Sequence, residues 1–184
     1  MFKVEKRKGS SLGLHDVWYF QTVGDSTLIL SLVKQRIKDQ FLQNWNSRLS
    51  TSSRALFYRN IANFTFQPYL NILNIGSVRK SMSQLRLSSH RLCTETGRWN
   101  QPTSTPINNR IYIFCQSLED EYHFIIECNS YLELRKQLIP IYYWKHPNML
   151  KFTELINCTN ARILRKFGSY VNKAFKIRNE LLYR

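Results

Sequence analysis

The sequence contains few acidic residues and no long apolar run. Only 12 Asp and Glu stand against 27 Lys and Arg, which leaves a formal charge of +15. No apolar stretch approaches the roughly 20 residues that a membrane-spanning helix needs. The four cysteines are too sparse for a disulfide framework, and the six glycines are too few for a collagen-like repeat. These absences exclude a membrane protein, a collagen-like fibre and a disulfide-dense secreted module.

The chain nevertheless has enough apolar residues to form a core. Apolar residues make up 43% of the sequence and aromatic residues 14%, which is more than a disordered chain carries. A length of 184 residues fits one or two small domains. The basic start is followed by no apolar segment, so we expect no signal peptide and an intracellular location, nuclear or cytoplasmic.

The positive charge is unevenly distributed. Residues 1–60, 61–110 and 151–184 carry net charges of +6, +5 and +6, whereas residues 111–150 carry −2. A basic field favours polyanions, because each phosphate that Lys or Arg neutralises releases condensed counterions. The composition therefore favours RNA or DNA as a partner. The alternative is a basic surface that is merely solvated.

Apolar periodicity predicts a mainly α-helical fold. Val33, Ile37, Phe41 and Trp45 recur every four residues and predict a helix, for which residues 25–27 offer N-cap candidates. We expect this stripe, like the others, to pack in a core. Further helices are expected at about 52–63, after Pro68, at 78–87, 123–128 and 131–143 (bent or shortened at Pro140), after Pro147, and at 160–183.

The pattern divides the chain into five parts. Ile111 to Phe114 is a short β-prone run that predicts one arm of a small hairpin. The expected fold is a helical domain with a small β-hairpin or zinc-knuckle-like insert. The parts are an irregular basic segment at 1–26, a helical region at 27–96, a loop or linker at 97–109, a degenerate zinc-binding-like motif at 110–130 and C-terminal helices at 131–184.

One group of residues has metal-ligand chemistry. Cys115, His123 and Cys128 are spaced Cys-x7-His-x4-Cys. A structural zinc site takes four ligands in a tetrahedron, and Tyr112 stands where a Cys-x2-Cys pair would begin. A phenol, with an ordinary pKa of about 10, is a poor substitute for a thiolate. The triplet fits either a zinc site with one ligand lost or two buried thiols beside a surface histidine.

Two blocks of the sequence carry a longer pattern. The first is Leu85-Arg86-Leu87-Ser88-Ser89-His90-Arg91-Leu92, followed by Glu95-Thr96-Gly97-Arg98-Trp99. The second is Arg110-Ile111-Tyr112-Ile113-Phe114-Cys115, then Glu119-Asp120-Glu121-Tyr122-His123-Phe124, then Glu127-Cys128, Tyr131 and Arg135. Together they resemble the C-terminal zinc-binding region of the reverse transcriptase polyproteins of non-LTR (LINE-type) retrotransposons. The resemblance covers about residues 25–182 and is densest from 80 to 136.

The resemblance implies a fragment of a retroelement polyprotein, with the rest of that polyprotein as a partner. The family's zinc ligands carry over only to Cys115, His123 and Cys128, because Tyr112 replaces the first family cysteine. Zinc binding is therefore expected to be weak or lost. Cys93 could supply a fourth thiolate, although its spacing gives no reason to expect it.

The sequence offers no catalytic set, so we expect no enzyme activity. It has only four aspartates and no Asp-Asp pair, whereas a polymerase needs adjacent carboxylates to hold two metal ions. We expect sequence-tolerant binding of RNA or DNA, with Arg86, Arg91, Arg98 and Arg110 near Trp99 as the local cluster, because arginine and a stacking ring suit unpaired bases. The alternative is a protein-interaction or structural remnant with no independent activity and exposed apolar patches.

Overall fold

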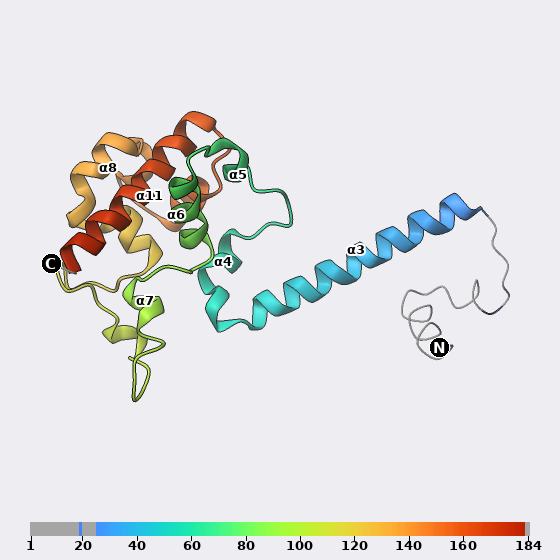
Figure 1. The fold of residues 1–184 in the computed structure, drawn as a ribbon, viewed down its shortest axis with the longest axis horizontal. Helices are drawn as coiled ribbons and strands as arrows, with labels where there is room; N and C mark the ends of the chain where they lie inside the picture. Colours follow the sequence, from blue (N-terminus) through green and yellow to red (C-terminus); the bar gives the residue numbers. More distant parts are fainter. Residues whose placement is uncertain (1–18, 20–24, 183–184) are drawn as a thin grey trace. The chain divides into compact units, whose positions relative to one another are not determined.

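The computed structural model describes Tyr19 and residues 25–182, apart from the Arg54 side chain. The chain divides into two units between Ser52 and Ser53. Most of the irregular segment predicted at 1–26 lies outside the described residues. The main helices (Figure 1) are α3 (Ser26–Thr51), α4 (Leu56–Ile61), α5 (Tyr69–Ile72), α6 (Gly76–Arg86), α7 (Cys93–Thr96), α8 (Leu132–Leu138), α9 (Ile141–Trp144), α10 (Met149–Ile156) and α11 (Ala161–Leu182).

Four short turns complete the helical structure of the described residues. Three are 3-10 turns, and the fourth is a single π-helical turn in the acidic part of the chain. They are η1 (Ser53–Ala55), η2 (Ile107–Asn109), η3 (His123–Glu127, the π turn) and η4 (Asn129–Tyr131).

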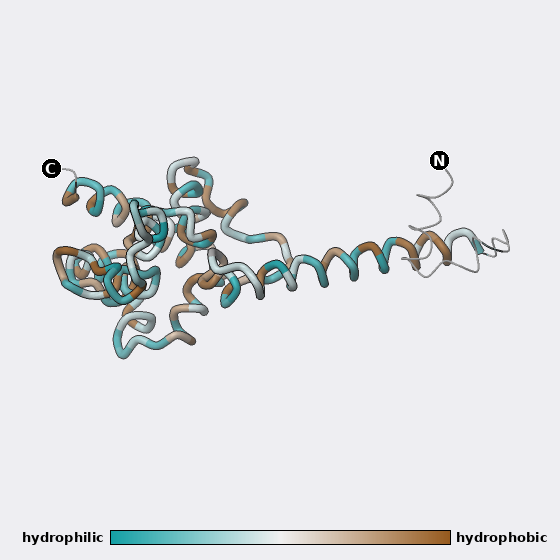
Figure 2. The backbone as a smooth tube through the Cα atoms, turned by 90° about the horizontal axis from the view of Figure 1, so that it is seen from below, coloured by the Kyte–Doolittle hydropathy of each residue, from teal (hydrophilic) through white to brown (hydrophobic). Residues whose placement is uncertain are grey.

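In the first unit, α3 begins at a predicted cap. Asp25 Oδ1 accepts hydrogen bonds from the backbone N–H groups of Thr27 and Leu28. Apolar and polar residues alternate along the helix (Figure 2). No residue of α3 is buried, and Ile37 is 53% exposed. The predicted helix is confirmed, but the expectation that its apolar stripe packs in a core is wrong.

In the second unit, the helices follow the predicted pattern. α5 begins directly after Pro68, and α8 ends before Pro140, because proline lacks the N–H that a helix interior needs. α11 begins after Asn160, whose Oδ1 accepts hydrogen bonds from the N–H groups of Arg162 and Ile163. The expectation of a mainly helical fold is confirmed.

The core of the second unit forms where α11 packs on α6 and α8 (Figure 1). Gly168 of α11 permits a close approach to the segment around α6. A Cβ atom at Gly168 would lie 2.9 Å from Val78 Cγ1 and 3.0 Å from Leu73 Cδ2. Two residues of α11, Phe167 and Tyr170, are buried together with Phe124 and Leu155 from other segments. α11 is therefore the central element of this core.

The predicted β-hairpin is wrong for the part of the chain that the structure describes. Ile111 and Leu118 form one isolated antiparallel bridge, and no strand extends from it. The backbone bonds that do form are short-range, such as Tyr112 N–H to the Ser117 carbonyl at 2.8 Å. Tyr112 lies in the core while Ile113 and Phe114 are exposed, so the β-prone run serves as a tight loop rather than a strand.

Hydrogen bonds hold both ends of the predicted loop at 97–109. Thr105 N–H donates to the Gly97 carbonyl at 2.8 Å. Arg110 crosses the loop, and its guanidinium donates to the carbonyls of Thr105 and Thr94. A Cβ at Gly97 would lie 2.8 Å from Arg110 Cδ. A side chain at position 97 would therefore force Arg110 to shift.

A buried ion pair links α11 to the run Glu119-Asp120-Glu121, which we call the acidic turn. Arg178 Nε lies 2.6 Å from Glu119 Oε1, and Arg178 Nη2 lies 2.7 Å from Glu119 Oε2. Only 1% of Glu119 and 3% of Arg178 are exposed. Glu119 Oε2 also accepts the Cys93 backbone N–H at 2.7 Å. This carboxylate therefore joins α7, the acidic turn and α11.

We predict that Glu119→Gln lowers the free energy of unfolding by about 3 kcal/mol, because it leaves the Arg178 guanidinium buried without a counter-charge. Urea denaturation measures the change. The matched control is Glu133→Gln, which breaks an exposed ion pair with Lys136 and should cost less than about 1 kcal/mol. Equal losses in the two variants would contradict a structural role for the buried pair.

Candidate functional site

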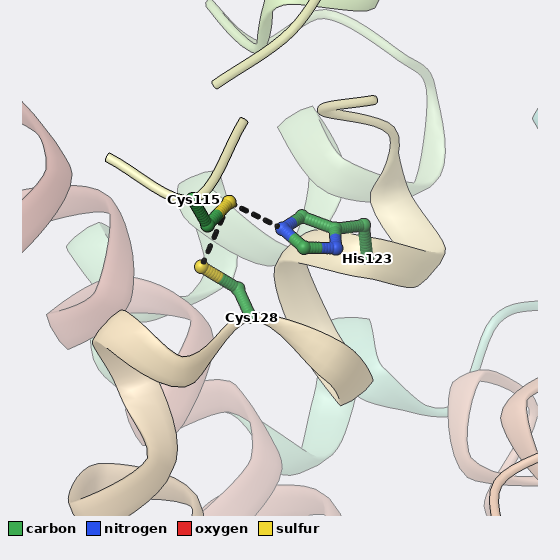
Figure 3. A group of neighbouring side chains, drawn as sticks. All are labelled: Cys115, His123 and Cys128. Atoms are coloured by element: carbon green, nitrogen blue, oxygen red, sulfur yellow. Dashed lines mark hydrogen bonds between the residues drawn. The ribbon is translucent and has the colours of Figure 1, made fainter. Parts of the chain in front are cut away.

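Cys115, His123 and Cys128 converge in the structure (Figure 3). The Cys115 Sγ lies 3.1 Å from His123 Nε2 and 4.0 Å from Cys128 Sγ. All three ligand atoms lie within 4.8 Å of one another. Ligands of a tetrahedral zinc ion, at about 2.3 Å for sulfur and 2.0 Å for nitrogen, are separated by about 3.5–3.8 Å. The group can therefore hold a metal ion with little movement.

A π turn brings His123 and Cys128 together. The backbone N–H of Cys128 donates to the carbonyl of His123, five residues earlier, at 2.8 Å. Asp120 Oδ1 accepts the His123 N–H at 2.7 Å and fixes the start of the turn. Hydrogen bonding of this kind, one residue wider than in an α-helix, is frequent at functional sites.

Two buried side chains satisfy the carbonyls at the end of this turn. The Arg135 guanidinium donates to the carbonyls of Ile125 and Cys128 at 2.9 and 2.8 Å. The Tyr170 hydroxyl donates to the Ile125 carbonyl at 2.9 Å. Arg135 is 2% exposed, so its charge is compensated by backbone dipoles rather than by a carboxylate. α8 and α11 thereby hold the ligand-bearing turn in place.

His123 is oriented as a metal ligand would be. Its Nε2 faces the thiol of Cys115, while its Nδ1 lies 3.6 Å from Glu127 Oε2. In metal sites the second ring nitrogen commonly faces a carboxylate, which fixes the tautomer and raises the basicity of the ligand. Glu127 was not among the residues expected at the metal site, although it lies in the second motif block. Its i,i+4 spacing from His123 is the signal that could have identified this role.

The environment of the Cys128 thiol opposes its ionisation. Burial raises the pKa of Cys128 against the lowering effect of hydrogen bonds with Ser130, and the neighbouring Cys115 adds to the rise. Thiols must lose their protons to bind zinc, and a bound cation reverses the balance by stabilising the thiolates. Metal affinity at this group should therefore increase with pH.

Tyr112 lies outside the ligand group. It is 1% exposed, and its hydroxyl accepts a hydrogen bond from the Tyr131 hydroxyl at 3.2 Å. Its ring packs edge-on against Phe114, and burial raises the pKa of the phenol. A neutral phenol that is engaged in the core does not replace the missing thiolate.

Cys93 does not complete the site either. Among the described residues it is absent from the metal-ligand group. Burial and the nearby Glu119 raise the pKa of its thiol to about 11. This cysteine belongs to the junction between α7 and the acidic turn.

The residues expected to contact nucleic acid do not form one exposed cluster. Arg86 is 3% exposed and donates to the Ile156 carbonyl, so it serves the core. Arg110 fastens the 97–109 loop, and Arg98 donates to the Ser53 carbonyl and faces Glu95. Arg91 is exposed, and Trp99 is 61% exposed. Three of the four arginines are therefore used within the chain.

Comparisons of the chain with protein-family models, with curated proteins and with solved structures found no match. Within the described residues, no helix combines the length and apolarity that crossing a membrane requires.

We predict that Tyr112→Cys increases zinc affinity over the native chain, because it places a thiol three residues before Cys115, where a Cys-x2-Cys pair would begin. Without metal, the variant should lose about 3–5 kcal/mol of stability, since it removes a buried aromatic ring. Zinc titration and thermal unfolding with and without zinc measure both effects.

The control for this prediction is Tyr112→Ala, which removes the same ring and supplies no ligand. Zinc should raise the melting temperature of the cysteine variant and leave that of the alanine variant unchanged. Tight, stoichiometric zinc in all three proteins would show that Tyr112 marks no lost ligand.

Proposed function

We propose that this chain is a non-catalytic part of a non-LTR retroelement reverse transcriptase polyprotein that binds RNA or DNA without sequence preference. The observation that carries the proposal is the convergence of Cys115, His123 and Cys128 on one point. These are the residues to which the family's zinc ligands carry over. Convergence supports an inherited zinc site over an accidental spacing of two thiols and a histidine.

The two motif blocks also depend on each other physically. In the first block, the Ser88 hydroxyl donates to Glu121 Oε1 at 2.6 Å, and His90 Nε2 lies 3.0 Å from the same oxygen. His90 Nδ1 accepts the Leu92 N–H at 3.3 Å, which leaves Nε2 to donate to Glu121. Both ring nitrogens of His90 are engaged within the chain, which supports a structural role for this residue.

This hydrogen-bond network lowers the pKa of the Glu121 carboxyl. Burial acts to raise its pKa, but the hydrogen bonds from His90 and Ser88 outweigh burial and leave the pKa below the ordinary value. The carboxylate therefore stays charged and accepts both bonds at neutral pH. A serine and a histidine in one block and a glutamate in the other form a single unit, which supports treating the blocks as one motif.

Zinc is the metal that the donor set favours. Two thiolates and one imidazole suit zinc, and a water molecule or an external group would complete the tetrahedron. Such an ion would tie the 112–118 loop to the π turn. Its contribution would be to structure, and it would supply no catalytic step.

Nucleic-acid binding is supported by the net charge of +15. We predict that the chain binds mixed-sequence RNA and DNA at low salt, with affinity falling linearly on a logarithmic salt scale. Filter binding across a salt series measures the slope. Binding that is absent at low salt, or that is independent of salt, would overturn this function.

A second candidate is a protein-interaction remnant, and α3 favours it. Leu28 and Leu32, one turn apart on α3, are 60% and 46% exposed, and Leu30 and Ile37 on the opposite side are 58% and 53% exposed. Exposed apolar side chains of this kind are typical of a surface that docks on another protein, here the remainder of the polyprotein. Aggregation of the isolated chain, relieved by the upstream polymerase region, would favour this candidate.

A further inference from the structure

α11 carries five exposed basic side chains on one face. We call this set the basic stripe: Arg162, Arg165, Lys166, Lys173 and Lys176. At 3.6 residues per turn, the five positions fall within an arc of about 100°. The buried residues of α11, including Leu164, Phe167 and Val171, centre on the opposite side. The stripe therefore points away from the core.

No carboxylate is paired with the stripe within the described part of the chain. None of its five side chains makes an ion pair or a side-chain hydrogen bond with another described residue. In contrast, Arg178 on the buried face of the same helix is paired with Glu119. Like charges three and four residues apart, such as Arg162 and Lys166, destabilise a helix. An external polyanion would offset that repulsion.

We propose that the basic stripe follows the phosphate backbone of double-stranded nucleic acid. From Arg162 to Lys176 the helix rises about 21 Å. Phosphates of one strand also wind about the duplex axis, so a straight stripe of this length meets several of them where it lies against the backbone. Glu180 is exposed about one turn beyond Lys176 and ends the stripe. The inference rests on the proposed nucleic-acid function and locates its contact surface.

The composition of this face favours a duplex over unpaired bases. The only other exposed residues of α11 within the described range are Asn179 and Glu180. Without an exposed aromatic ring, the face offers no platform on which bases can stack. It also offers no large apolar side chain that would enter a bilayer, as a membrane-binding helix requires. Charge alone would hold the ligand, and binding would not depend on base sequence.

The test compares two variants of the full chain with equal charge. The stripe variant is Arg165→Gln/Lys166→Gln/Lys173→Gln. The control variant is Lys34→Gln/Lys38→Gln/Lys145→Gln, which changes exposed lysines elsewhere. Both lower the formal net charge by three, from +15 to +12. Circular dichroism and thermal unfolding check that both variants keep their fold, and fluorescence anisotropy with a mixed-sequence DNA duplex measures binding across a salt series.

The stripe variant should bind the duplex at least about tenfold more weakly than the control variant at low salt, and the magnitude of its salt slope should fall by about 2–3. Equal loss in both variants would overturn the inference and leave the proposed function standing. Failure of the native chain to bind any nucleic acid would overturn both. Preference for single strands over the duplex, or equal stripe-dependent binding to phosphatidylserine vesicles, would overturn the assignment of the partner.

Discussion

The buried ion pair between Glu119 and Arg178 is the interaction on which the second unit depends. Two opposite charges removed from water stabilise a fold only when the geometry is good and their remaining hydrogen-bonding groups are satisfied. Here the pair is bidentate, and the same carboxylate also holds the N–H of Cys93. The acidic turn is thereby fixed against α11, and the metal ligands flank it in the chain, with Cys115 before it and His123 and Cys128 after it.

The residues of the acidic turn therefore make contacts within the fold, although the chain as a whole is basic. Glu119 neutralises the charge of Arg178. Glu121 accepts hydrogen bonds from Ser88 and His90. Asp120 accepts the His123 N–H at the start of the π turn. Burial raises the pKa of Asp120 against the lowering effect of its hydrogen bond with the His123 N–H. Because these carboxylates face inward, they leave the exposed positive charges of α11 unopposed. The negative net charge of residues 111–150 thus describes the interior of the unit more than its surface.

Local patterns in the sequence predicted most of the helices, because capping and proline placement act over a few residues. The Asp25 cap, α5 after Pro68 and the end of α8 before Pro140 are of this kind.

Long-range packing was not predictable from the sequence. The 111–114 run has β propensity, yet burial of Tyr112 against Tyr131 fixes it as a loop. Arg86 was expected at a nucleic-acid surface and lies in the core, since spacing does not reveal which arginines find carbonyl acceptors. The Cys-His-Cys group was predictable because its members are close in sequence.

The π turn at His123–Glu127 also constrains how this part of the sequence can change. In an α-helix, residues five positions apart point about 140° away from each other, so a regular helix would separate His123 from Cys128. The wider turn places them on the same side and requires the four intervening residues, no more and no fewer. Substitutions between them are tolerable where core packing allows, whereas a single insertion or deletion would rotate one ligand out of reach. For the geometry of the two ligands, the number of residues between them matters more than the identity of those residues.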